Sequence, residues 1–190
     1  MAEKEVNIKE KIDFFEYNGK IYKYYCAREN METEPQPVRY TKEIAGRLGF
    51  ECEVFYHESS GRTTEDAERA TGVDTDHIIK CLLLKSKKDE YVGAIVRGSD
   101  RLNFKEIEAV TGYKGLRMAQ ESDIREQLGF DIGGVPAVIF REKGIQTFVD
   151  QHVLDMDYVV GSGGTPHHGM RFEPSQLTDR LSYTAKNIIQ

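Results

Sequence analysis

The sequence contains no tryptophan and only three cysteines, Cys26, Cys52 and Cys81, among its 190 residues. An odd number of widely spaced cysteines does not indicate a disulfide framework, so reduced thiols are the simpler interpretation. The chain also lacks the roughly 20 consecutive apolar residues that a membrane helix needs. Its N-terminus, MAEKEVNIKEK, lacks the apolar stretch of a signal peptide. We therefore predict a cytoplasmic protein that has no contact with a membrane.

The sequence contains fewer basic than acidic residues. Lys and Arg number 26 against 32 Asp and Glu, which gives a formal net charge of −6. This balance disfavours a broad, non-specific nucleic-acid surface, and DNA is not an expected partner. It leaves open a small basic pocket that grips one end of an RNA. Hydrophobic residues at 39% and charged residues at 31% fit a folded globular protein.

Several catalytic signatures are missing. We find no metal-binding cysteine spacing, no His-x-x-x-His and no zinc-deaminase pattern. There is no Walker-type phosphate loop, no dinucleotide fingerprint and no Gly-x-Ser-x-Gly nucleophile elbow. The sequence therefore predicts neither a metal nor a cofactor, and it offers no side-chain nucleophile of the triad kind.

One boundary stands out near the N-terminus. Residues 32–37 are polar and contain two prolines, which is typical of a linker or an extended arm. We therefore divide the chain into an N-terminal segment, 1–37, and a main domain, 38–190. No internal repeat or low-complexity tract suggests a further division.

The N-terminal segment is rich in aromatic residues around Asn18-Gly19, the strongest short signal for a hairpin turn. We predict a β-hairpin over residues 12–26. Its aromatic residues alternate with Lys20 and Lys23, so the hairpin could contact RNA or form a homodimer. The simpler interpretation is that it packs its rings on the main domain, as any half-buried hairpin does.

After the prolines, the pattern alternates between helix and strand and predicts a mixed, partly antiparallel α/β or α+β domain. We expect helices that begin at Thr41, Thr63, Asn103 and Glu121 and near Pro174, with Phe104, Ile107 and Val110 facing inward. We expect strands at Glu53–His57, Ile78–Lys85, Tyr91–Arg97, Leu116–Ala119, Tyr158–Val160 and Met170–Phe172, and a hairpin at Ala137–Val149.

Lys80 is the most informative single residue. Because side chains alternate along a strand, Lys80 shares a face with Leu82 and Leu84. An ammonium on an apolar face is costly unless an anion meets it or its stem reaches water. Lys80 is thus either a ligand for a phosphate or carboxylate, or a lysine that reaches solvent at a sheet edge.

Two glycine-rich loops could approach a ligand closely. The first, Gly129–Pro136, contains the pair Gly133-Gly134, whose N–H groups can form a concavity. Judged by its glycines alone, this loop is more simply interpreted as a tight connection between a helix and a strand. The second, Gly161–Gly169, combines three glycines, two hydroxyl residues and two histidines before its final glycine. Irregular loops of this composition are more often functional than not, the alternative being a flexible surface hairpin.

The order of these features resembles the YbaK-like family of aminoacyl-tRNA editing domains, related to the insertion domain of bacterial prolyl-tRNA synthetase. The resemblance covers roughly residues 40–185. The matching pieces are Leu48-Gly49, Arg62–Ala67, Ile79–Leu82, Arg97–Asp100, Leu102-Asn103, Leu116–Ala119, Gly133–Pro136, Gly161–His168, Pro174 and Leu177. The resemblance implies a mixed sheet curved toward a barrel, with helices around it. The N-terminal hairpin lies outside the resemblance and is expected to be an extension of this domain.

The resemblance also implies a hydrolase that acts in trans on the ester of a mischarged tRNA, with a small amino acid of the alanine, serine or cysteine class. Lys80 would hold the phosphate beside the terminal adenosine. The family has no dedicated nucleophile, and the substrate's ribose hydroxyl helps to position water. The implied catalytic residues are Lys80, Gly133, Gly134 and Pro136. The implied substrate-binding residues are Val135, Gly161, Ser162, Gly163, Gly164, His167 and His168.

Two departures from the family pattern keep an alternative open. Cys81 follows the lysine where a threonine or similar small residue is usual, and Ala137-Val138 follow the loop proline where an aromatic or hydrophobic residue and a glycine are frequent. The alternative is a non-catalytic module of the same fold that binds an aminoacyl-tRNA end, a nucleotide or a protein partner.

Overall fold

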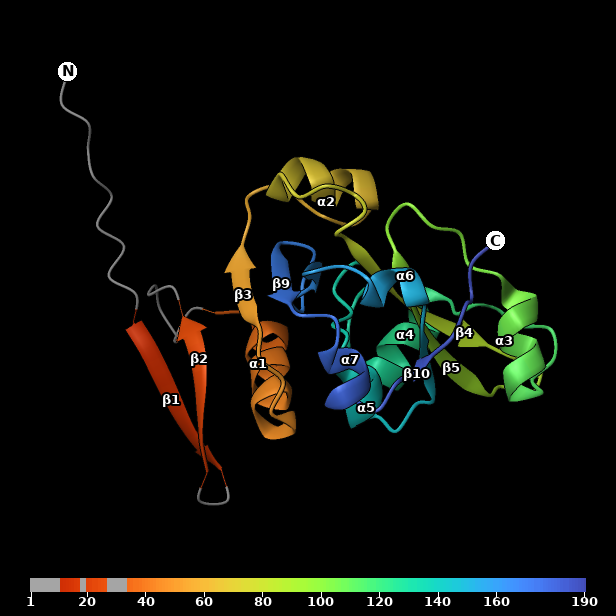
Figure 1. Cartoon of the computed structure of the whole chain (residues 1–190), viewed down its shortest axis with the longest axis horizontal. Helices are drawn as coiled ribbons and strands as arrows, with labels where there is room; N and C mark the ends of the chain where they lie inside the picture. The colour runs from red at the N-terminus through yellow and green to blue at the C-terminus, as the bar shows by residue number, and fades with distance from the viewer. Residues whose placement is uncertain (1–10, 18–19, 27–33) are drawn as a thin grey trace.

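The computed structural model describes residues 34–190 in full, together with the backbone of two strands near the N-terminus (Figure 1). The strands are β1 Lys11–Tyr17, β2 Lys20–Cys26, β3 Glu53–Tyr56, β4 Ile79–Lys85, β5 Tyr91–Arg97, β6 Arg117–Met118, β7 Thr147–Val149, β8 Val159–Ser162, β9 His168–Phe172 and β10 Thr184–Ala185. The helices are α1 Gln36–Leu48, α2 Thr64–Thr71, α3 Phe104–Thr111, α4 Glu121–Leu128, α5 Ile139–Glu142, α6 Gln151–Leu154 and α7 Gln176–Asp179.

The strands form two five-stranded sheets, in the orders β1-β2-β3-β9-β8 and β10-β7-β5-β4-β6. In the first sheet, β1 and β2 are antiparallel, with Lys11 opposite Cys26 and Tyr17 opposite Lys20. The hairpin strands are therefore as predicted, while the turn at residues 18–19 lies outside the described residues. The second sheet is mixed, because β4 and β5 are antiparallel whereas β5 and β7 are parallel. The predicted mixed α/β class is confirmed.

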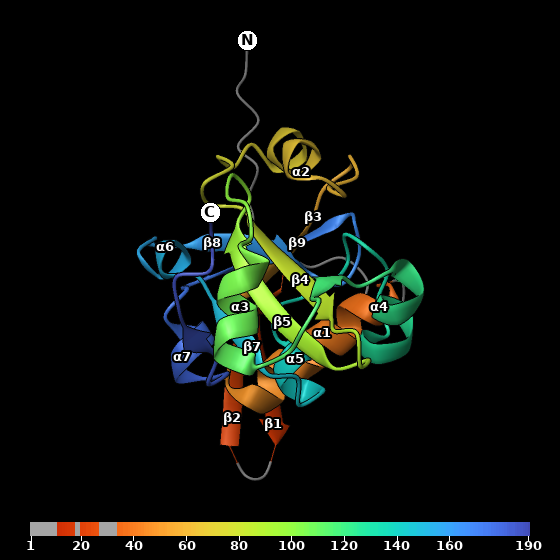
Figure 2. The same ribbon diagram turned by 90° about the vertical axis from the view of Figure 1, so that its right-hand side faces the viewer.

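The second sheet is buried on both faces. Alternation along β4 and β5 sends Leu83 and Ile95 into one core cluster and Leu84 and Val92 into another. The first cluster also contains side chains from α1, α4 and α7, and the second contains Ile107 of α3. Figure 2 shows α3 lying across β4 and β5. Period-two alternation on a sheet with two cores explains why β4 and β5 are apolar almost throughout.

The two sheets meet along β4 without closing. A parallel bridge joins Ile78 to Val160 of β8, and farther along the strand β6 pairs with Leu84 and Lys85. Within residues 34–190, no strand pairs with this edge of β4 between the two points. The sheets thus curve toward each other, but the described strands do not form a closed barrel. This gap exposes the segment of β4 that carries Lys80.

Local signals fix most helix ends. The Thr63 hydroxyl accepts the Asp66 N–H at the start of α2, and Gly72 ends α2 in the left-handed conformation. The first helix differs from the prediction, because α1 begins at Gln36 rather than at Thr41. A proline is tolerated in the first turn of a helix. Thr41 lies inside α1, where its hydroxyl donates to the carbonyl of Pro37.

The predicted hairpin at Ala137–Val149 is wrong. The chain instead forms the short helix α5 and then β7, which pairs in parallel with β5. The four residues 137–140 are all fully buried in the first core cluster. A short, continuous apolar run is compatible with a buried helix or a buried strand, and its periodicity cannot distinguish them.

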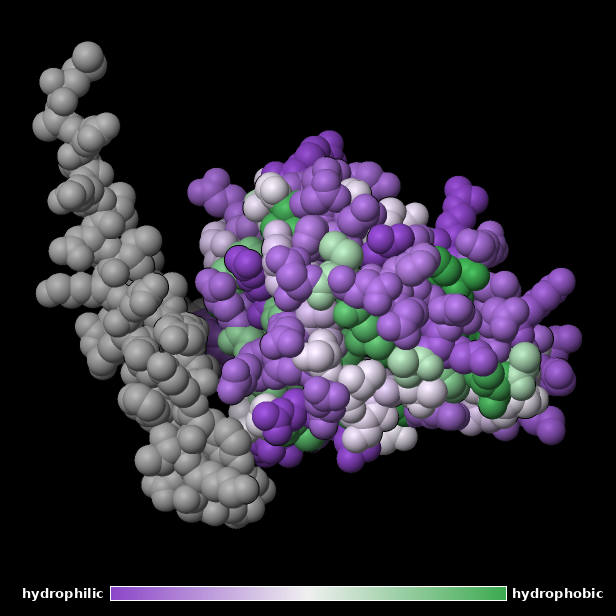
Figure 3. All heavy atoms as spheres, in the orientation of Figure 1, coloured by the Kyte–Doolittle hydropathy of each residue, from purple (hydrophilic) through white to green (hydrophobic). Residues whose placement is uncertain are grey.

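The surface is largely hydrophilic, as the view in Figure 3 shows. Four large apolar side chains among residues 34–190 are exposed, namely Tyr56, Val110, Met118 and Ile132. Val110 was expected to face inward, but it is 40% exposed on α3. None of the described helices has the length and apolar character required to cross a bilayer.

Candidate functional site

A pocket of about 570 Å³ opens at the gap beside β4. Segments distant in sequence line it: the start of α2, β4, the loop around Gly133 and the loop that links β8 to β9. Of the residues predicted for the site, Lys80, Gly133, Val135, Gly161, Ser162 and His168 line this pocket. Gly134, Pro136, Gly163 and Gly164 are buried outside the lining, and His167 is exposed.

The Lys80 amine is held by the turn that follows β5. Its Nζ donates to the carbonyl oxygens of Gly98 at 2.9 Å and Asp100 at 2.6 Å. An ammonium has three N–H donors, so one donor remains for a ligand in the pocket. Burial lowers the pKa of Lys80, and the neighbouring Asp100 and Glu65 carboxylates oppose this shift. The amine is therefore an oriented donor rather than a freely solvated charge.

The two glycine-rich loops pack directly against each other. A Cβ atom added at Gly134 would lie 2.9 Å from the Gly164 carbonyl oxygen, so a side chain there would push the loops apart. Gly133 has a φ of 83°, in the left-handed region that favours glycine. Both glycines therefore serve to place backbone close to backbone at the pocket wall.

The Gly133 loop also presents backbone donors. The Gly134 N–H donates to the Asp131 carbonyl at 2.9 Å and so closes the turn. Within residues 34–190, the N–H groups of Gly133 and Val135 have no hydrogen-bond acceptor. Both residues line the pocket, and a polar group left without a partner there favours an acceptor supplied by a ligand.

The structure distinguishes the two histidines of the second loop. The His168 ring lines the pocket, with its Nδ1 2.7 Å from the Thr165 hydroxyl oxygen. Burial lowers the pKa of His168, and nearby His57, Lys42 and His167 act in the same direction against the opposing charge of Glu34. This environment favours the neutral form of its imidazole. His167 lies outside the pocket, beside Tyr56.

Sequence reasoning missed several lining residues. His57 and Arg62 come from the segment that leads into α2, Glu65 lies in the first turn of α2, Met118 lies on β6, and Ile132 lies on the loop before Gly133. Arg62 could have been found from the sequence, because it belongs to the Arg62–Ala67 stretch of the family resemblance. Met118 lies in the Leu116–Ala119 piece of the same resemblance. Ile132 carries no signal of its own, since only the folded chain brings it to the pocket.

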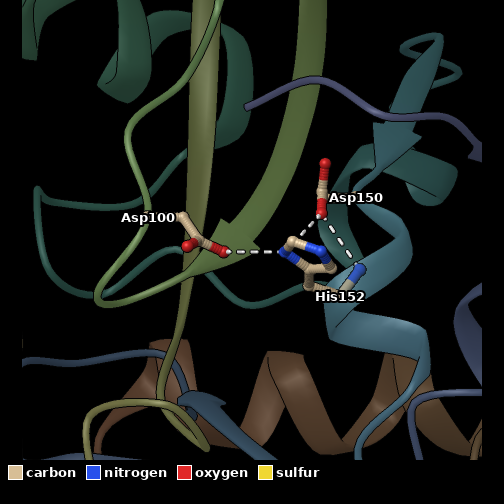
Figure 4. Close-up of side chains that lie close together, drawn as sticks. All are labelled: Asp100, Asp150 and His152. Carbon is tan, nitrogen blue, oxygen red and sulfur yellow. Dashed lines mark hydrogen bonds and ion pairs between the residues drawn. The ribbon is translucent and has the colours of Figure 1, made fainter. Parts of the chain in front are cut away.

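A cluster of three polar side chains lies close to the Asp100 carbonyl that accepts a hydrogen bond from Lys80. Asp100, Asp150 and His152 have potential ligand atoms within 4.8 Å of one another (Figure 4). Their partners are protein groups: Arg97 donates twice to Asp100, and buried Asp150 accepts the N–H groups of His152 and Ile188. Hydrogen bonding and ion pairing thus account for the arrangement, which anchors the turn after β5.

Comparison with known proteins agrees with the fold and identifies the family. The profile of the aminoacyl-tRNA editing domain family matches residues 58–179. The chain belongs to this family, so the predicted family is confirmed, and the prediction of an editing hydrolase is confirmed at the level of class. The match includes Lys80 and both glycine-rich loops.

Individual relatives point the same way. The chain is 35% identical over 96 residues to the proline–tRNA ligase of Thermosipho melanesiensis, and 25% identical over 141 residues to that of Trichlorobacter lovleyi. These matches span 47% and 70% of this chain but only 17% and 24% of the ligases. A crystal structure described as a candidate trans-editing enzyme for prolyl-tRNA synthetase superposes with a TM-score of 0.74 at 26% identity, covering 83% of this chain and 99% of that one.

Proposed function

We propose that this protein is a trans-acting, cytoplasmic aminoacyl-tRNA deacylase that removes a small amino acid of the alanine, serine or cysteine class. The observation that carries the proposal is a single pocket lined by Lys80, Gly133, Val135 and His168, in which the N–H groups of Gly133 and Val135 have no acceptor within residues 34–190. Membership of the editing domain family supports it. The partner is the 3′ end of an aminoacyl-tRNA.

The reaction is ester hydrolysis. Water adds to the ester carbonyl, the bond from the carbonyl carbon to the ribose oxygen breaks, and a proton passes to that oxygen. The products are the free amino acid and a tRNA with its terminal hydroxyl restored. Negative charge develops on the carbonyl oxygen, and the N–H groups of Gly133 and Val135 would stabilise it as preorganised donors.

The remaining residues orient the substrate. The free donor of Lys80 would bind the phosphate beside the terminal adenosine, which places the ester near the Gly133 loop. The ribose hydroxyl next to the ester would help to position the water, since no side-chain nucleophile is required. Ser162 and His168 would border the amino acid.

A deacylation panel tests the proposal. The full-length protein is incubated with tRNA charged with alanine, serine, cysteine or proline, and the loss of each ester is compared with its uncatalysed rate. We expect accelerated loss for at least one of the three small amino acids. Lys80→Ala should lower kcat/KM about 10- to 100-fold, because a charged hydrogen bond to the substrate is lost.

The matched control is Lys105→Ala, since Lys105 is an exposed lysine on α3 away from the pocket. Its rate should equal that of the wild type. Loss of every ester at the uncatalysed rate would contradict the proposal. Tight binding of the charged tRNA without hydrolysis would instead support the non-catalytic alternative.

A further inference from the structure

Ring side chains gather at the mouth of the pocket. We call Tyr56, His57, His167 and His168 the aromatic rim. Tyr56 lies 5.4 Å from His168 and 6.5 Å from His167 between ring centroids, and the planes of Tyr56 and His167 differ by only 23°. His57 lies 6.4 Å from His167. Because His57 and His168 also line the pocket, the rim is continuous with it.

The rim is held in place by the backbone beneath it. The His57 N–H donates to the His167 carbonyl at 3.0 Å, and the Gly61 N–H donates to the Pro166 carbonyl at 2.7 Å. Tyr56 stands opposite His168 in the β3–β9 pairing, yet its side chain is 64% exposed. A large ring fixed on a strand and left uncovered contributes little to the core and is available to a ligand.

Arg62 adds a cation on the same segment. It is exposed and lines the pocket, and its backbone and side-chain carbons face Gly133. Among the residues described from 34 onward, no carboxylate lies within ion-pair distance of its guanidinium. A guanidinium without an internal partner matches the geometry of a phosphate.

We propose that the aromatic rim and Arg62 form a subsite for the penultimate nucleotide of the tRNA acceptor end. The Tyr56 ring would stack on the base, and Arg62 would pair with the phosphate on the 5′ side of that nucleotide. This inference rests on the proposed deacylase function. If the terminal adenosine occupies the pocket with its phosphate on Lys80, the preceding nucleotide has to leave through the mouth, where the rim lies.

The chemistry favours an unpaired nucleotide over other occupants. Aromatic rings with a nearby cation are the usual elements that hold single-stranded nucleic acid, because every base has a π-face. Stacking does not need a broadly basic surface, which agrees with the net charge of −6. A protein partner would require a larger apolar area than the single exposed tyrosine ring of the rim.

Two non-hydrolysable probes separate this subsite from the pocket. One is adenosine 5′-phosphate with an amide-linked amino acid at its 3′ carbon, so that it already carries the phosphate assigned to Lys80. The other carries a 5′-phosphorylated cytidine in addition, joined through that phosphate. The amino acid is the one that the deacylation panel shows to be removed fastest. By titration calorimetry, the wild type should bind the longer probe about 10- to 100-fold more tightly than the shorter one.

Substitutions then show which residues are responsible for the higher affinity of the longer probe. Tyr56→Ala should abolish most of the gain and leave the affinity for the shorter probe unchanged, whereas Tyr56→Phe, which keeps a ring, should retain it. Arg62→Gln should reduce the gain and weaken its dependence on salt. Val110→Ala, which trims an exposed apolar residue on α3, should behave as the wild type.

The possible failures are distinguishable. Equal affinity of the wild type for the two probes would overturn the subsite while leaving the deacylase proposal intact. A Tyr56→Ala variant that loses affinity for both probes equally would also overturn it, since the residue would then support the pocket itself. Hydrolysis of no charged tRNA in the panel would remove the deacylase proposal and the subsite with it.

Discussion

At the scale of single residues, an ion pair beside the pocket acts on Lys80 through the backbone. Arg97 donates to both carboxylate oxygens of Asp100, at 2.9 and 3.1 Å, and the Asp100 carbonyl accepts from Lys80. The carboxylate therefore stabilises the turn that orients the amine. Asp100 is a positioning residue in this view, because its side chain bonds to Arg97 and not to the substrate.

A double-mutant cycle tests this role. Asp100→Ala should lower kcat/KM about tenfold in the wild-type background, because the turn loosens and the amine loses its orientation. In the Lys80→Ala background, the same change should have little further effect. If Asp100→Ala lowered the rate equally in both backgrounds, the residue would act on stability or on another part of the site. Thermal unfolding of each variant provides the control.

The two described cysteines should be unreactive in the folded protein. Burial raises the pKa of Cys52 and of Cys81 to about 12, so thiolate is scarce at pH 8. Iodoacetamide should modify both roughly 1,000-fold more slowly than in the unfolded chain, as measured by peptide mass spectrometry. Rapid native labelling of Cys81, which lines the pocket, would contradict the raised pKa of its thiol.

The raised pKa values of Cys52 and Cys81 also determine how the stability of the fold changes with pH. The pKa values of the two thiols in the folded state exceed the ordinary thiol value of 9.0. The protonated thiols therefore contribute fully to the free energy of unfolding below about pH 9. This contribution is lost as the pH rises toward 12, because only the unfolded chain releases the protons there. Urea unfolding at pH 8 and pH 10 should therefore show lower stability at pH 10.

At the scale of elements, α2 is the pocket wall with the least support. None of its residues is buried, and its ends depend on the Thr63 cap and on Gly72. The strand β5 across the core is, by contrast, almost wholly buried. Segments with few buried contacts open at low free energy, so α2 is the element most able to move when a substrate enters.

Hydrogen exchange should therefore be faster in α2 than in β4 or β5. The non-hydrolysable aminoacyl-adenosine probe should slow exchange in α2, because Thr64 and Glu65 line the pocket that it fills. Thr63→Ala should accelerate exchange in the free protein, since a lost cap costs about 1 kcal/mol. Exchange in α2 as slow as in β5 would show that this wall is rigid.

At the scale of the whole molecule, the net charge of −6 limits how the protein holds tRNA. Lys80 and Arg62 are the two cations proposed to contact phosphates. Each phosphate contact with a single strand contributes about 0.7 to the slope of log affinity against log salt. Two contacts give a slope near −1.4.

We therefore expect KM for charged tRNA to rise only about sevenfold between 50 and 200 mM salt. Arg62→Gln should halve the slope, and Lys105→Ala on α3 should leave it unchanged. Steady-state kinetics across a salt series measures both effects. A slope several times steeper would reveal further phosphate contacts, in particular from the lysines of the N-terminal segment. The predicted boundary between that segment and the main domain at residue 37 would then have to be revised. This boundary stays a prediction.

Elements that have local signals could be predicted from the sequence. Caps at Thr63 and Asn103, the glycines that end helices, and alternation in β4 and β5 act over a few residues, and all were found. The family and the predicted residues Lys80, Gly133, Val135, Gly161, Ser162 and His168 of the pocket also followed from motifs. Local signals did not settle residues 137–140, because a short buried run has no distinguishing period.

How these elements pack against one another could be seen only in the folded chain. The gap between the sheets at β4, the turn carbonyls that hold Lys80, and the separation of His168 from His167 all depend on contacts between distant segments. The same is true of the rim that brings Tyr56 and Arg62 to the pocket mouth. Such contacts form when the apolar faces of elements distant in sequence pack against one another, and no short stretch of sequence specifies which faces pack together.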